Sequence, residues 1–75
     1  MITVRELASR SGATVQRIRE LIMHGLLTPE VKAKNRGGRN LFSENAVDIV
    51  KRIEQMKVQG IKRSTIRLLM DTGNF

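Results

Sequence analysis

Residues 3–25 read TVRELASRSGATVQRIRELIMHG and contain two short helical patterns separated by a turn of four residues. Thr3 and Glu6 form a capping box, in which each side chain can satisfy a free backbone N–H at a helix start. Apolar residues then recur at helical spacing until Ser11-Gly12. The sequence therefore predicts a first helix over about Val4–Arg10.

A second helix is expected between Thr14, whose hydroxyl can act as its N-cap, and Gly25, which can end it. Gln16, Glu20 and Met23 lie on one side of its helical wheel, flanked by Arg17 and Arg19. Its apolar residues lie on the other side, and they are Val15, Ile18, Leu21 and Ile22. Two short helices joined this closely are typical of a helix-turn-helix.

The pattern changes after Gly25. Short strands are expected at Val31–Lys34 and Asn40–Phe42, separated by Asn and Gly residues that tolerate the positive φ of a tight turn. They would form a polar β-hairpin, called the wing below, that needs support from the helical core. The fold class predicted from these parts is mainly α, a winged helix-turn-helix with about four short helices and a small two-stranded wing.

The last third of the chain predicts two more helices. Ser43 is expected to cap the first of them, and Gly60 to end it. Its apolar residues follow the i, i+3, i+4, i+7 spacing of an amphipathic helix, and they are Ala46, Ile49, Val50, Ile53 and Met56. A final helix is expected over about Ser64–Met70. With 75 residues and no linker pattern, we expect one domain spanning residues 1–75.

Charge points to a polyanionic partner, although a basic soluble protein without such a partner fits the net charge alone. The chain has 14 Lys and Arg against 7 Asp and Glu, a formal charge of +7. Residues 31–42 and 57–67 each hold four cations and no acid. Because each neutralised phosphate releases counterions, clustered cations of this kind favour nucleic-acid binding.

Several function classes are excluded on composition. There is no Cys, and the single His24 has no co-ligand cluster, so neither a metal nor another cofactor is expected. No paired carboxylates, nucleophile–base pair or phosphate-cradling loop indicates an enzyme. No apolar run has the length of a signal or membrane segment, so we expect a cytoplasmic protein.

The ordered set of parts resembles the MerR-type DNA-binding domain. The resemblance rests on ITVRELA at 2–8, Ile18-Arg19, GLLTP at 25–29 and LFSE at 41–44, followed by the helix that closes at Gly60-Ile61. It extends from residue 2 to about residue 70. It implies a winged helix-turn-helix whose second helix enters the major groove, while the wing and the helix pair behind it contact the flanking backbone.

The resemblance implies DNA contacts residue by residue. Thr14, Gln16 and Arg17 fall where the family's recognition helix meets DNA, and Arg19 matches an Arg that contacts phosphate. The remaining candidates are basic residues of the wing and of the start of the last helix, namely Lys34, Arg36, Arg39, Lys62 and Arg63. The free N–H groups of that helix start can also bind phosphate.

The chain departs from the family at several of these positions. Glu20 stands where a hydroxyl commonly contacts the backbone, so it reads a base, orients Arg17 or Arg19, or simply faces water. Arg39-Asn40 replaces an aromatic-Arg pair. The family's dimerisation helix and effector domain have no counterpart in these residues. We therefore expect no small-molecule effector here, and a free monomer that can assemble on DNA.

Sequence-specific binding of double-stranded DNA by a transcriptional regulator is the function that the sequence favours. An architectural protein such as an excisionase is the alternative within DNA binding. An RNA-binding protein fits less well, because the sequence offers no aromatic platform for stacking bases. A protein-interaction module is the remaining alternative, and its binding would survive high salt.

Overall fold

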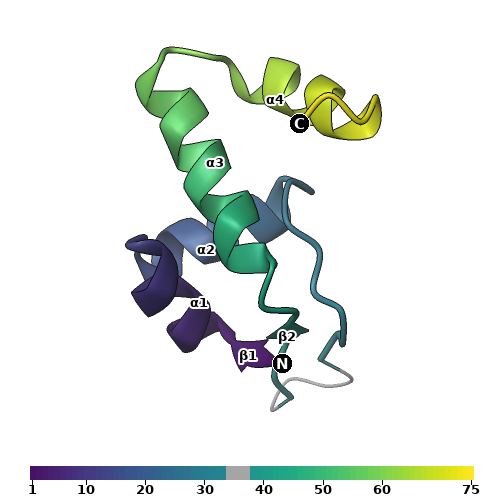
Figure 1. The fold of residues 1–75 in the computed structure, drawn as a ribbon. Coiled ribbons are helices and arrows are strands. Elements are labelled where there is room, and N and C mark those ends of the chain that lie inside the picture. The colour runs from purple at the N-terminus through teal and green to yellow at the C-terminus, as the bar shows by residue number, and fades with distance from the viewer. Residues whose placement is uncertain (34–37) are drawn as a thin grey trace.

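The computed structural model describes residues 1–33 and 38–75, and in this part of the chain it contains four helices and two short strands. Their order is β1 (Ile2–Thr3), α1 (Val4–Ser11), α2 (Val15–Met23), β2 (Leu41–Phe42), α3 (Ala46–Val58) and α4 (Arg63–Asp71). Helix α1 packs against both α2 and α3, and α4 lies at the end of α3 that is distant from the sheet (Figure 1). The predicted mainly helical class is confirmed.

The two N-terminal helices begin where the sequence predicts. The hydroxyl of Thr3 accepts a hydrogen bond from the Glu6 N–H at 3.3 Å, and that of Thr14 accepts one from the Arg17 N–H at 3.0 Å. Gly12 ends α1 in the left-handed conformation, with φ of 79°. These contacts span three residues or fewer of sequence, which is why the local pattern was sufficient to predict them.

The sheet differs from the predicted hairpin. Strand β2 pairs in antiparallel fashion with the N-terminal β1, so that Ile2 faces Phe42. Of the expected strand Val31–Lys34, Val31 forms a single bridge to Leu41, and Lys34 lies outside the described residues. Both pairings form, because Leu41 pairs with Thr3 on one edge and with Val31 on the other. The sequence did not predict the pairing with β1, which contributes to burying Ile2 to 2% exposure, whereas Val31 on the other edge stays 40% exposed.

The predicted cap of α3 is wrong. The hydroxyl of Ser43 donates to Asn45 Oδ1, and only its backbone carbonyl accepts from the Ala46 N–H, at 3.1 Å. The helix begins at Ala46, after Asn45, which makes no capping bond with its side chain. Helix α4 begins at Arg63, one residue earlier than predicted, and Lys62 before it also makes no such bond.

The core forms where α1, α2, α3 and the sheet meet. It consists of Ile2, Leu7, Ala8, Ile18, Leu21, Leu26, Leu27, Phe42, Ala46, Val50, Ile53 and Ile66. Met56, which the helical spacing placed on the apolar face of α3, and Met70 of α4 are partly buried against it. Within α4 Ile66 is fully buried and Met70 is partly buried, so these two side chains provide the apolar contacts of this helix with the core.

Two arginines of α4 also attach it to the C-terminal end of α2. Arg67 Nη1 donates to the His24 carbonyl at 3.1 Å, and Arg63 Nη1 lies 3.0 Å from the His24 ring Nε2. Cations are favourable at the carbonyl end of a helix, where the backbone dipole is negative. Gly25 has φ of 75°, and a side chain there would collide with the Arg67 guanidinium.

We expect Gly25→Ala to destabilise the chain more than Gly12→Ala does. Both glycines have left-handed φ, which costs an L-residue about 1–2 kcal/mol. Only at position 25 must Arg67 also move and release the His24 carbonyl, since no atom lies near a side chain at position 12. Urea unfolding measures both variants, and equal losses of stability would show that the Arg67 contact contributes nothing.

Candidate nucleic-acid interface

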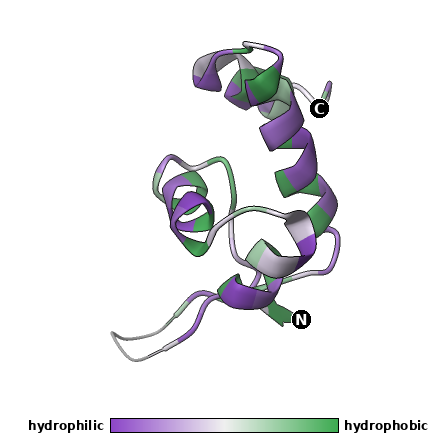
Figure 2. Ribbon diagram, turned by 90° about the vertical axis from the view of Figure 1, so that its left-hand side faces the viewer, coloured by the Kyte–Doolittle hydropathy of each residue, from purple (hydrophilic) through white to green (hydrophobic). Residues whose placement is uncertain are grey.

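Helix α2 buries one side and exposes the other. Ile18 and Leu21 are fully buried, which confirms the predicted core face of this helix. On the opposite side Gln16 is exposed, and the side chain of Met23 reaches 74% exposure. Figure 2 shows this division along the helices as alternating hydrophobic and hydrophilic stretches of ribbon. The polar side of α2 is therefore accessible to a partner.

Three arginines from three parts of the chain line one groove beside α2. Arg5 comes from α1, Arg19 from α2 and Arg39 from the segment before β2, and the groove has a volume of about 380 Å³. All three residues are exposed. Its other lining residues are Thr3, Val4, Val15, Ile22, Gly38 and Asn40. We call this surface the arginine groove.

The charges of the arginine groove are not neutralised by the protein. Within residues 1–33 and 38–75, none of its three arginines forms an ion pair. By contrast, Arg10, Arg17 and Arg67 all pair with carboxylates. Like charges gathered without counter-charges create a positive potential that attracts anions.

Arg17 lies elsewhere, against α3. Its Nε donates to Glu54 Oε1 at 2.6 Å and its Nη1 to Glu20 Oε2 at 3.3 Å, and its side chain is only 21% exposed. Arg17 and Arg19, which flank the polar face of α2 in the sequence pattern, therefore lie in different surroundings. Glu20 pairs with Arg17, which is one of the three roles that the sequence left open for this residue.

The other predicted contact residues are spread over the surface. The hydroxyl of Thr14 is engaged in capping α2. Lys62 and Arg63 are exposed at the start of α4, where Arg63 contacts His24, and neither residue lines the arginine groove. Lys34 and Arg36 lie outside the described residues.

Sequence reasoning missed Arg5 and Glu54. The capping box at Thr3 placed Arg5 in the first turn of α1, but no local signal shows that this turn faces Arg19. Glu54 had no distinguishing pattern, since it is one of several charged residues on an amphipathic helix. The roles of Arg5 and Glu54 both depend on contacts between elements that are distant in the sequence.

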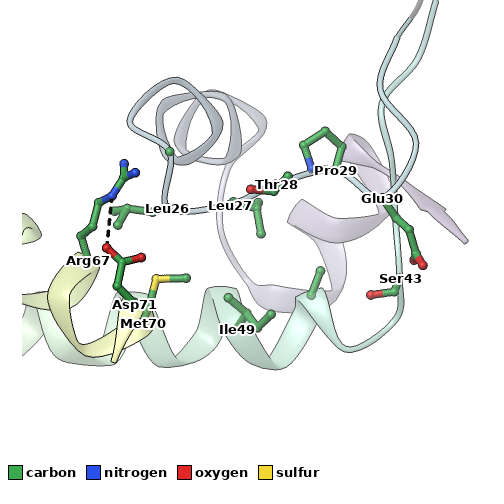
Figure 3. A pocket seen from close by; sticks show the side chains of 12 residues that line it. Leu26, Leu27, Thr28, Pro29, Glu30, Ser43, Ile49, Arg67, Met70 and Asp71 are labelled. Atoms are coloured by element: carbon green, nitrogen blue, oxygen red, sulfur yellow. Dashed lines mark ion pairs between the residues drawn. The ribbon is translucent and has the colours of Figure 1, made fainter. Parts of the chain in front are cut away.

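A second groove of about 540 Å³ lies between α3, α4 and the segment after α2 (Figure 3). Its walls are largely apolar, with Leu26 and Ile49 facing into it. Its charged residues are Glu30, Arg67 and Asp71, and Arg67 lies 4.0 Å from Asp71 in an ion pair. A groove in which carboxylates outnumber cations does not suit a polyanion.

Metal and membrane sites were also sought. In the part of the chain that the structure describes, no three His, Cys, Asp or Glu residues gather as metal ligands would. No described helix combines the length and the apolar composition needed to cross a membrane.

Comparisons with known proteins agree with this fold. The chain is similar to the transcription regulator PbrR691 from Ralstonia metallidurans CH34, whose crystal structure is a complex with lead(II). The TM-score is 0.84 at 22% identity, over 99% of this chain and 56% of that one, so this chain spans little more than half the length of that regulator. The likeness confirms the winged helix-turn-helix fold. No curated protein matches the sequence.

The family comparison covers almost the whole chain. The family described as MerR HTH family regulatory protein matches residues 2–73. Its members are DNA-binding transcription regulators and not enzymes, in agreement with the expectation from the sequence. The chain belongs to the MerR HTH family of regulatory proteins.

Proposed function

We propose that this chain binds double-stranded DNA sequence-specifically as a transcription regulator, with α2 in the major groove and the arginine groove on the adjacent phosphate backbone. The observation that carries this proposal is the convergence of Arg5, Arg19 and Arg39, which have no ion pairs in the described residues, beside the exposed face of α2. A regulator of this kind is expected to act on DNA in the cytoplasm.

Phosphate is the anion that suits the arginine groove best. A guanidinium presents several N–H donors in a plane and binds phosphate oxygens in a bidentate manner. Helix α1 also begins at this groove with Val4 and Arg5, and the positive end of its dipole adds to the attraction. Backbone contacts of this kind fix the register of a protein on the duplex.

Base reading is assigned to the exposed face of α2. Gln16 can bind adenine through two hydrogen bonds, and Glu20 can accept from the amino group of cytosine. Thr14 stands at the N-terminal end of the same helix. The basic residues of the wing, Lys34, Arg36 and Arg39, are expected to contact the flanking backbone or the minor groove. Beyond the other end of α2, Lys62 and Arg63 are expected to contact the flanking backbone.

The experiment that tests this function is selection of bound sequences from a random duplex pool. A conserved motif among the selected sequences is the expected result. Spaced repeats bound with strong bending would favour the architectural alternative, and preference for RNA would contradict the proposal. Sedimentation without DNA tests the expected free monomer.

The affinity for duplex DNA is expected to fall steeply with salt. If each arginine of the groove neutralises one phosphate, these residues alone contribute about −2.7 to the slope of log affinity against log salt. A titration from low to high salt measures this slope. Arg10→Ala is the control that should leave it unchanged, because Arg10 already pairs with Glu6 and Glu44. Binding that persists at high salt would favour a protein partner instead.

A further inference from the structure

Arg17 is held by carboxylates from two helices. Glu20 belongs to its own helix α2, and Glu54 belongs to α3, 37 residues further along the chain. The 2.6 Å contact with Glu54 is the shortest ion pair among residues 1–33 and 38–75. Glu54 is 32% exposed and Arg17 21% exposed, so this pair is better shielded from water than the exposed pairs of Arg10.

This ion pair is a polar contact between two helices that also share the apolar core, through Ile18 and Leu21 of α2 and Val50 and Ile53 of α3. Helix α1 packs extensively against both α2 and α3, whereas the backbones of α2 and α3 make few close approaches to each other. The Arg17–Glu54 pair therefore ties α2 directly to α3. Residues 17 and 19 lie about 160° apart around the helix axis, so Arg17 points to α3 while Arg19 points to the arginine groove.

We propose that Glu54 is a positioning residue for α2. It fixes the orientation of this helix through Arg17 and, together with Glu20, keeps the Arg17 guanidinium from binding DNA. The DNA part of this inference rests on the proposed function. Base reading then belongs to Gln16 and Glu20, and Arg17 takes the structural role instead of the base contact expected from the sequence.

The charges in the cluster favour this arrangement. A single guanidinium between two carboxylates leaves an excess negative charge, so the cluster repels phosphate. Releasing Arg17 to DNA would leave the partly buried Glu54 without its partner, and a carboxylate shielded from water is costly when unpaired. Glu54 thus keeps Arg17 from adding a phosphate contact, which would not depend on the DNA sequence.

A double-mutant cycle without DNA tests the tie between the helices. Arg17→Met and Glu54→Gln each remove one partner with little change of volume. We expect each variant to lower Tm, and the double variant to lower it by no more than the worse single variant, because both break the same interaction. Additive Tm losses would overturn the tie.

A second measurement separates positioning from mere stability. Glu54→Gln releases Arg17, so affinity for random duplex should rise about two- to fivefold, the range of an exposed ion pair, and the salt slope should steepen by about 0.9. Discrimination between the selected and random duplexes should fall. In the Arg17→Met background the same substitution should change neither the slope nor the discrimination.

The matched control is Glu44→Gln, which removes the same charge from the cluster around Arg10. It should change the affinities for both duplexes by one small common factor. If Glu54→Gln behaves like this control, or acts equally with and without Arg17, Glu54 works only through its charge and the proposal is wrong. A wild-type chain that binds no duplex overturns the proposed function and the DNA role of Glu54, while the Tm cycle still decides the tie.

Discussion

Replacing Arg5, Arg19 and Arg39 together with alanine is expected to weaken binding of the selected duplex by about 100-fold. Each arginine offers phosphate a charge-assisted hydrogen bond, which at an exposed site contributes about 1 kcal/mol, and about 1.4 kcal/mol corresponds to a tenfold change. All three side chains are exposed, so the fold should be retained. Fluorescence anisotropy with a labelled duplex measures the affinity, and circular dichroism checks the helices.

The control for this variant removes the same charge elsewhere. Alanine at Arg10, Lys51 and Lys57 also lowers the formal charge from +7 to +4, but none of these residues lines the arginine groove. The control should lose less affinity, and the salt slope should flatten by about 2.7 only for the groove variant. Equal losses of affinity in both variants would mean that DNA binding depends on net charge alone and that the position of the groove arginines does not matter.

Phe42→Ala is expected to lower Tm by about 15–30 °C. Phe42 is 1% exposed and is one of two aromatic residues in the chain. Removing a buried Phe side chain costs about 3–5 kcal/mol, against a total stability of about 4–11 kcal/mol for a domain of this size. Each kcal/mol corresponds to about 4–8 °C in such a domain. Thermal unfolding followed by circular dichroism measures the change.

The loss should extend to DNA binding, because Phe42 pairs with Ile2 and thereby fixes the start of α1 beside the arginine groove. Val58→Ala provides the control, since this side chain is 87% exposed and should change stability by less than about 0.5 kcal/mol. A decrease in Tm of less than about 5 °C for Phe42→Ala would show that the core does not depend on this ring.

The sequence by itself determined where the two N-terminal helices form and which side of α2 is buried. The hydroxyls of Thr3 and Thr14 cap their helices by accepting hydrogen bonds from backbone N–H groups three residues further along, and Gly12 ends the first helix with a positive φ. The spacing of Ile18 and Leu21 gave the buried face of α2. These features depend on neighbouring residues alone, so the local pattern was enough to predict them and to indicate the family.

The tertiary structure decided which distant residues meet. It added the N-terminal strand Ile2–Thr3 to the edge of β2 that does not face Val31, where Ile2 is buried from water. It brought Arg5 beside Arg19 and Arg39, and it placed Arg17 against Glu54, 37 residues away. On the helical wheel Arg17 and Arg19 are equivalent neighbours of one polar face. Tertiary packing gave them different surroundings, because one edge of α2 meets a carboxylate of α3 and the other meets an open groove lined partly by α1.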